Sequence, residues 1–356
     1  MPSDVIDHPR DVREGEALDV ERVGAYLRDA IAGLQGEVTI QQFPSGFSNL
    51  TYLIGVGERK LVLRRPPFGK KARTAHDMGR EVRMLRALKP YFRYCPEVLA
   101  YCEDPEVLGA TFYVMERIEG IIPRTNFPRG VELTPEQARG LCERWIDVFC
   151  ELHAIDHEAV GLGDYGRPEG YVRRQVDGWS KRFRDAHTAD APDFESVMAW
   201  LQDHMPADTD APCVIHNDYK FDNIVLEPDD PLNIIGVLDW EMATIGDPLM
   251  DLGSSLAYWV EGDDPDEAQM IRTLPTTLPG MLSRDEVVAR YAERSGRSFD
   301  SFDFYHVFGL FRLAVIAQQI YYRFYHGQTK DERFGMLVFA VTILEQSAQR
   351  VIERHG

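Results

Sequence analysis

The sequence predicts an α+β protein of two lobes, in which a small antiparallel sheet precedes a larger, mostly helical part. Five short runs rich in β-branched and aromatic residues, separated by turn-forming segments, lie at 38–43, 50–56, 60–65, 97–104 and 111–118. Beyond Gly120, apolar residues recur mainly at helical spacing. A chain of 356 residues is also longer than one small core usually holds, which favours two lobes.

The five-stranded lobe is expected to carry one main helix. This segment, 76–92, places on one helical face the apolar residues Met78, Val82, Leu85 and Leu88. Another helix is expected over 17–34, before the sheet. The chain is therefore predicted to divide into an extension with its helix at 1–36, a first lobe at 37–117 and a helical lobe at 118–356.

The helical lobe begins with a clear helix start. Thr134 and Gln137 have the spacing of a capping box, Pro135 suits the first helical position, and the helix is expected to reach His153. Further helices are predicted at 171–186, 193–205, 302–326 and 330–353, and a hairpin at 223–240.

Composition limits the possible partners and compartments. The 58 acidic and 39 basic residues leave a net charge of −19, which would repel a phosphate backbone, so nucleic acid is not expected as a partner. Five cysteines without a C-x-x-C pair indicate neither a disulfide framework nor a zinc site.

The amino terminus and the longest apolar stretch also bear on the compartment. The first 16 residues are polar and acidic, unlike a signal peptide. The apolar stretch 307–322 includes Arg312 and is shorter than the roughly 20 residues that span a bilayer. We expect a soluble cytoplasmic protein with no membrane partner; the sequence does not indicate an oligomeric state.

One short stretch of the helical lobe carries the residues best suited to chemistry. The run HNDYKFDN at 216–223 fits the H-x-D-x-x-x-x-N catalytic loop of phosphoryl-transfer enzymes, and Asp239 stands where the metal-binding aspartate of D-F-G would be. We predict that Asp218 is the base and that Lys220 lies near the transferred group. Asn223 and Asp239 are predicted to hold Mg²⁺, which prefers hard oxygen ligands.

Each of these residues also has an ordinary structural explanation. Asp218 and Asn223 could be turn residues, and Asp239 could simply end a strand. His216 is expected to brace the loop by hydrogen bonding rather than to react. The joint occurrence of these residues at the required spacing, around a predicted hairpin, favours phosphoryl transfer.

Three carboxylates downstream leave alternatives open. Glu241 is either an outer partner of a metal or an exposed loop residue. Asp247 and Asp251 could bond the amides of the catalytic loop, or Asp247 could begin a turn and cap the next helix.

The turn between the first two strands is a candidate phosphate-covering loop. Its backbone amides and small polar side chains suit this role at Ser45, Gly46, Ser48 and Asn49. An ordinary hairpin turn would have the same composition.

Two further features of the first lobe fit a nucleotide site. Arg64 stands where a phosphate-pairing lysine is usual, and Glu81 on the next helix is its expected partner, with a surface salt bridge as the alternative. A hinge whose backbone could meet an adenine edge is expected around Glu116 and Ile118.

With these residues in place, the chain resembles the aminoglycoside phosphotransferase family of the protein-kinase-like superfamily over about 38–258. The resemblance is carried by HNDYKFDN, VLDWE, IGDPLMDL and ELHAID. Other segments resemble the kinase-like module fused to certain acyl-CoA dehydrogenases, namely GFSNLTYLI, LVLRRPPFG, AHDMGREVRMLRAL, TFYVMERIEG and GRPEGYVRRQVDGW.

The resemblance implies a two-lobed protein-kinase-like fold that uses ATP or GTP with Mg²⁺ and transfers the γ-phosphoryl group to a hydroxyl of a small molecule. By motif position it implies the same roles for Asp218, Asn223 and Asp239. The chain departs from the family pattern at Arg64, usually lysine, and at Asn217, commonly glycine.

The acceptor and the extent of activity stay open. A hydroxyacyl-CoA or related hydroxy acid fits the resemblance to the fused module, and its phosphates could meet the basic helix 171–186, unless that face is only solvated. A catalytically weak nucleotide-binding scaffold is a third possibility, supported by Arg64 and Asn217. An aminoglycoside acceptor also remains possible, because an acidic lobe attracts polycations.

Overall fold

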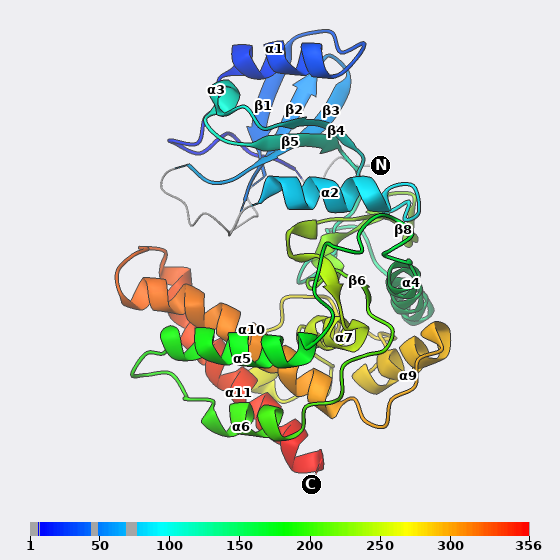
Figure 1. The fold of residues 1–356 in the computed structure, drawn as a ribbon, viewed down its shortest axis with the longest axis vertical. Helices are drawn as coiled ribbons and strands as arrows, with labels where there is room; N and C mark the ends of the chain where they lie inside the picture. Colours follow the sequence, from blue (N-terminus) through cyan, green and yellow to red (C-terminus); the bar gives the residue numbers. More distant parts are fainter. Residues whose placement is uncertain (1–5, 7, 44–48, 69–76, 356) are drawn as a thin grey trace. The chain divides into compact units, whose positions relative to one another are not determined.

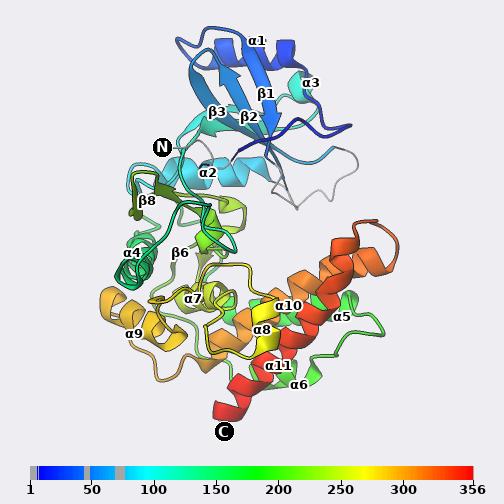
Figure 2. The same cartoon turned by 180° about the vertical axis from the view of Figure 1, so that it is seen from behind.

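The computed structural model describes residues 6, 8–43, 49–68 and 77–355. The chain forms two compact units (Figures 1 and 2). Unit 1 comprises Met1–Ile122, Pro128–Val131 and Asn223–Ala243, and unit 2 comprises Pro123–Phe127, Glu132–Asp222 and Thr244–Gly356. The domain boundaries expected from the sequence, at 36/37 and 117/118, stay a prediction.

Unit 1 contains the expected five-stranded antiparallel sheet. Its spatial order is β1-β2-β3-β5-β4. The strands are β1 (Val38–Gln42), β2 (Leu50–Val56), β3 (Arg59–Arg65), β4 (Val98–Cys102) and β5 (Phe112–Glu116). In the register, Arg64 near the end of β3 lies between Thr51 of β2 and Tyr113 of β5, so its side chain starts from the middle of the sheet.

Helices cover the sheet of unit 1 on its two sides. Helix α1 (Val20–Ala30) buries Val23 and Leu27 in one apolar cluster with residues of β2, β3 and β5. Helix α2 (Met78–Leu88) lies across the sheet from α1 (Figure 1). A short helix, α3 (Pro105–Leu108), precedes β5.

A hairpin from the middle of the chain completes unit 1. It consists of β7 (Ile224–Glu227) and β8 (Asp230–Val237), followed by the 3₁₀ turn η3 (Trp240–Met242). Reciprocal backbone bonds of 2.8 and 2.9 Å join Leu226 to Ile121, and the Val237 N–H donates to the Tyr94 carbonyl at 2.9 Å. These bonds attach the segment that carries Asn223 and Asp239 to unit 1.

Unit 2 is mostly helical. Its helices are α4 (Pro135–His153), α5 (Tyr171–Asp185), α6 (Glu195–Asp203), α7 (Pro248–Leu256), α8 (Asp266–Met270), α9 (Arg284–Ser295), α10 (Asp303–Tyr325) and α11 (Leu337–His355). The predicted capping box at Thr134 is present, with Gln137 as its partner. The 3₁₀ turn η4 (Glu332–Met336) comes before α11, so the last helix begins later than the sequence pattern predicted.

Two features of unit 2 fix the surroundings of the catalytic loop. The short strands β6 (Cys213–Ile215) and β9 (Thr244–Gly246) pair on either side of it in sequence. Helices α7 and α10 approach so closely that a Cβ atom at Gly253 would meet the Tyr305 carbonyl and one at Gly309 would meet the Gly253 carbonyl. Only glycine allows this contact, which holds α7 firmly against α10.

The long helices of unit 2 can be compared with the length and hydropathy that a membrane-spanning helix needs. None of the helices in the described ranges is long and apolar enough to cross a membrane.

Candidate active site

The guanidinium of Arg64 is the centre of a charged cluster in unit 1. Its Nη1 donates to Glu81 Oε1 at 2.7 Å, and its Nη2 donates to Asp239 Oδ1 at 3.0 Å and to Glu241 Oε2 at 3.3 Å. The four residues come from β3, α2 and the segment after β8. The structure therefore brings together the predicted Arg64–Glu81 pair and the predicted metal ligand Asp239.

Burial controls the electrostatics of this cluster. Arg64 and Glu81 are 7% and 3% exposed. Burial by itself would lower the pKa of Arg64, but Glu81 and the neighbouring Tyr113, Asp239 and Glu241 raise it well above its ordinary value. Burial raises the pKa of Glu81 more than Arg64 lowers it. Arg64 is thus a permanent cation that Glu81 holds in place.

Asp239 and Glu241 are the more accessible members of the cluster. Their side chains are 38% and 23% exposed, and Asn49 donates to Glu241 Oε2 at 2.7 Å. Asp239 has a left-handed backbone with φ 65°, a conformation that is uncommon for non-glycine residues and that aspartate tolerates better than most. Three carboxylates against one guanidinium leave a formal excess of two negative charges, and oxygen donors with this excess fit a divalent magnesium ion.

The other residues predicted for the nucleotide site in unit 1 do not belong to the four-residue Arg64 cluster. Ser45, Gly46 and Ser48 lie outside the described residues. The Glu116 N–H donates to the Glu97 carbonyl at 2.9 Å, and the Glu116 carboxylate forms an ion pair with Lys89.

Ile118 and Asn223 of unit 1 are placed mainly by their neighbours. The Ile118 side chain packs against Gly236. The Asn223 carbonyl accepts a hydrogen bond from the Leu238 N–H at 2.8 Å, which fixes the backbone of Asn223 beside the strand that leads to Asp239. The roles of these residues toward a nucleotide stay predictions.

In unit 2, the buried carboxylate of Asp251 holds the start of the catalytic loop. It accepts hydrogen bonds from the backbone N–H groups of His216 at 2.6 Å and Asn217 at 2.7 Å. The third contact is His153 Nε2 at 3.2 Å, and the other ring nitrogen of His153 contacts the Tyr291 hydroxyl at 2.7 Å.

The tautomer of His153 follows from these partners. Because a carboxylate only accepts, Nε2 carries the proton and Nδ1 accepts from Tyr291. Burial lowers the pKa of His153, which keeps the ring neutral. The alternatives left open by the sequence are now separated, since Asp251 bonds the loop amides, whereas Asp247 caps α7 through the N–H groups of Leu249 and Met250.

Asn217 adopts the backbone conformation that glycine adopts easily. Its φ is 64°, in the left-handed region, where asparagine is among the best tolerated non-glycine residues. The buried guanidinium of Arg312 donates to the Asn217 carbonyl at 2.7 Å. Asparagine in place of the usual glycine is therefore compatible with this turn.

Asp218 and Lys220 form an ion pair at the centre of the loop. Lys220 Nζ lies 3.3 Å from Asp218 Oδ2, 3.6 Å from Asp222 Oδ1, and 4.7 Å from the ring centroid of Tyr258. Burial opposes the charge of Lys220, but Tyr258, Asp218 and Asp222 raise its pKa. The Asp218 N–H donates to His216 Nδ1 at 3.2 Å. This arrangement presents a carboxylate beside a fixed ammonium group.

Fold and site together define a phosphotransferase with a kinase-like fold. The model of the phosphotransferase enzyme family matches residues 39–286, and the chain belongs to this family. Mouse acyl-CoA dehydrogenase family member 10 is 33% identical over 92% of the chain, and the match spans only 30% of that protein.

Two solved structures illustrate the fold similarity. A putative aminoglycoside phosphotransferase from Ralstonia eutropha is 28% identical, with a TM-score of 0.80 over 95% of this chain and 99% of the other. An aminoglycoside phosphotransferase solved with GDP and kanamycin is 15% identical, with a TM-score of 0.62 over 93% of this chain and 99% of the other, and shares the fold.

Some supporting residues were not predicted from the sequence. The sequence offered an indication for two of them. Arg312 interrupts an apolar helical stretch, and His153 lies in ELHAID, a segment that resembles the family's. No sequence pattern indicated Tyr258 or Tyr291, since each contacts a residue that is distant in sequence.

Arg64 is expected to stabilise unit 1 through Glu81. Arg64→Ala leaves that carboxylate buried without its cation and should lower the free energy of unfolding by about 3–5 kcal/mol. Arg64→Lys should lower the free energy of unfolding by less, because an ammonium group can still pair with Glu81. Some loss is expected, because lysine cannot contact Glu81 and Asp239 through two separate nitrogens as arginine does. Urea unfolding would measure both, with Arg59→Ala, an exposed residue of the same strand, as the control. Equal losses for Arg64→Ala and Arg59→Ala would contradict this account.

Asp251 is expected to stabilise the loop through its two backbone contacts. Asp251→Asn keeps the size of the side chain but leaves only one acceptor oxygen, so one buried N–H loses its partner at a cost of about 1–3 kcal/mol. Thermal and urea unfolding would measure the loss against Asp285→Asn, an exposed aspartate in the first turn of α9. The same stability for the two variants would show that Asp251 does not hold the loop.

Proposed function

We propose that this protein is a small-molecule kinase that transfers the γ-phosphoryl group of ATP or GTP to a hydroxyl group. The Asp218–Lys220 pair, on a loop held by Asp251, carries the proposal, because it provides a carboxylate to orient a hydroxyl and a cation to neutralise a phosphoryl group. Membership of the phosphotransferase family supports the reaction class.

The proposed nucleotide site uses the Arg64 cluster of unit 1. Arg64, held by Glu81, pairs with phosphate, while Asn223 and Asp239 hold Mg²⁺ and Glu241 lies behind them. Bound with the nucleotide, Mg²⁺ would neutralise charge on the phosphoryl oxygens. No group of three or more His, Cys, Asp or Glu residues within the described part of the chain could hold a metal. This suits magnesium, which usually takes one or two carboxylates and completes its shell with phosphates and water.

In the proposed reaction, Asp218 orients the acceptor hydroxyl and accepts its proton as the oxygen attacks the γ-phosphorus, while the bond from that phosphorus to the bridging oxygen breaks and the nucleoside diphosphate leaves. Lys220 offsets the negative charge, and its contacts with Asp222 and Tyr258 keep it from moving when phosphate arrives. His216 braces the loop through the Asp218 N–H. Since all five cysteines are free thiols, we place the enzyme in the cytoplasm.

The proposed acceptor is a hydroxyacyl-CoA or a related hydroxy acid. Its support is the similarity to acyl-CoA dehydrogenase family member 10, of which the chain spans less than a third. The basic helix α5 is a weak candidate for the acceptor's phosphates, because Arg184 pairs with Glu195 and Lys181 pairs with Asp185. These contacts favour a solvated helix face.

Two variants should separate the roles of the site. Asp218→Asn should lower kcat by about 10²–10⁴-fold and leave nucleotide binding intact, because the base is lost without a change in the nucleotide site. Asp239→Asn should weaken Mg²⁺-dependent nucleotide binding. Calorimetric titration of ATP with and without Mg²⁺, together with slow ATP hydrolysis, would measure both. Equal hydrolysis by wild type and Asp218→Asn would favour a nucleotide-binding scaffold, and the reverse order of effects would contradict the assigned roles.

The acceptor class can be tested by a screen with purified protein and ATP. Hydroxyacyl-CoA thioesters and free hydroxy acids should gain one phosphoryl group by mass spectrometry, and Asp218→Asn should abolish the gain. An aminoglycoside such as kanamycin serves as the comparison. Phosphorylation of the aminoglycoside alone would overturn the acceptor assignment and leave the kinase assignment in place.

A further inference from the structure

A cavity of about 120 Å³ in unit 2 lies apart from the residues assigned above. It is enclosed by α8, α9, α10, α11 and the segment that follows α7. Its lining is mixed: polar and charged groups share it with the apolar residues Leu256, Ala268, Ile271, Leu310, Leu344 and Val351. Because drug-sized ligands usually occupy roughly 300–1,000 Å³, the volume suits a small metabolite.

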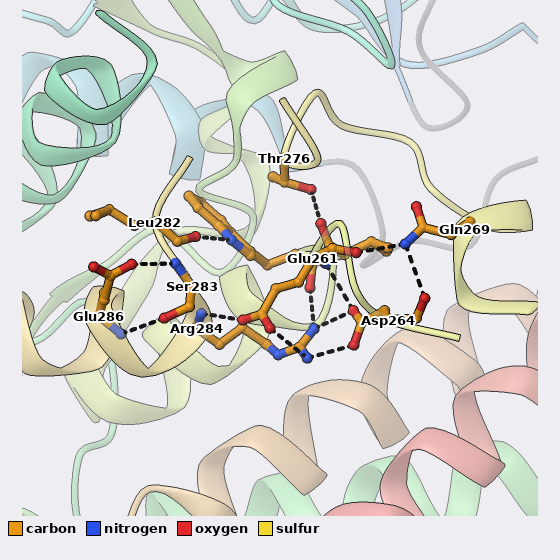
Figure 3. A network of polar contacts seen from close by, with 10 residues as sticks. Glu261, Asp264, Gln269, Thr276, Leu282, Ser283, Arg284 and Glu286 are labelled. Atoms are coloured by element: carbon orange, nitrogen blue, oxygen red, sulfur yellow. Dashed lines mark hydrogen bonds and ion pairs between the residues drawn. The ribbon is translucent and has the colours of Figure 1, made fainter. Parts of the chain in front are cut away.

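One charged wall of this cavity is already neutralised. Arg284 pairs with Asp264 at 2.6 and 2.7 Å and with Glu261 at 3.3 Å, as Figure 3 shows. The Gln269 side chain also donates to the carbonyls of Glu261 and Asp264 (Figure 3). These contacts fix the wall and leave Arg284 with little attraction for another anion.

The lining also includes two cations from α11 that have no acidic partner among the described residues. Arg350 and Arg354 lie one turn apart on α11, and neither forms an ion pair with any residue that the structure describes. Within the described ranges, the one acceptor of an Arg350 side-chain hydrogen bond is the Ser347 hydroxyl, at 2.9 Å. Like charges at this spacing repel each other weakly, and an anion between the two guanidinium groups would remove this repulsion.

The lining also contains the polar side chains of Asp303, Asp285 and His306. Asp303 is paired with His355 at 2.8 Å, and Asp285 is exposed in the first turn of α9. His306 has no side-chain hydrogen bond among the described residues, and burial, aided by Arg284, lowers its pKa to about 3. Its neutral ring can therefore donate one N–H to a ligand.

We propose that this cavity binds a small organic anion, with a carboxylate or phosphate head group at Arg350 and Arg354 and a short apolar body against the apolar residues of the lining. Two guanidinium groups provide the donors that such oxyanions prefer. The site does not depend on the kinase assignment, because none of its residues belongs to the proposed reaction.

The cavity lies close in space to the loop that carries Lys220. Trp259 lines the cavity, and its ring centroid is 5.5 Å from that of Phe221, which follows Lys220. The preceding residue, Tyr258, contacts Lys220 itself. A ligand in the cavity would thus lie against the segment that positions Lys220.

The test is calorimetric titration in a buffer without phosphate or carboxylate. The probes are butyl phosphate and butyrate, which share an apolar body, with 1-butanol as the uncharged comparison. Wild-type protein should bind at least one anion with one-to-one stoichiometry and should not bind 1-butanol. The anion that binds identifies the head group. Arg350→Gln and Arg354→Gln should each weaken binding at least tenfold, whereas Arg323→Gln, an exposed position on α10, should change it less than twofold.

Three outcomes would overturn the proposal. These are a failure of both anions to bind, unchanged binding in Arg354→Gln, and displacement of the anion by saturating MgATP while both arginine variants still bind it. Matching melting curves of the variants and wild type would confirm that a loss of binding is local, since Arg354 is exposed near the end of α11.

Discussion

The conformation of the catalytic loop depends on the buried carboxylate of Asp251. Two consecutive backbone N–H groups, those of His216 and Asn217, point at one side chain, and this requires the turn that Asn217 makes with a positive φ. The neutral ring of His153 donates to Oδ2 of Asp251, the oxygen that also accepts from the His216 N–H, while Oδ1 accepts from the Asn217 N–H. An acid buried without such partners would be strongly unfavourable, and three donors make its burial possible.

The position of Asp251 in turn depends on backbone packing. Helix α7 carries Asp251 and lies in backbone contact with α10, because Gly253 and Gly309 leave room for the approach. Helix α10 also supplies Arg312, which bonds the carbonyl of Asn217. The loop is therefore fixed at its amides by α7 and at a carbonyl by α10. Two helices that are distant in sequence thus fix the backbone that leads into Asp218.

Much of the fold could be predicted from the sequence because its signals are local. Strand alternation and turn residues predicted the five-stranded sheet, and the capping box predicted the start of α4. The pairing of β6 with β9 could not be predicted, because three-residue strands carry no periodic pattern. For the site, the positions of Arg64 and Glu81 relative to a kinase-like motif predicted their contact, whereas the contact of Tyr258 with Lys220 depends on tertiary packing alone.

The two charged clusters have the same physical design. Each places one cation among carboxylates that outnumber it: Arg64 contacts three, and Lys220 lies near two. The cation is therefore held before a ligand arrives, which reduces the reorganisation needed on binding. The surplus negative charge in the Arg64 cluster would repel a bare polyphosphate. In the proposed function, a nucleotide that arrives with a divalent cation would bring the charge that this cluster lacks, so the proposed site would bind a metal–nucleotide complex in preference to the free nucleotide.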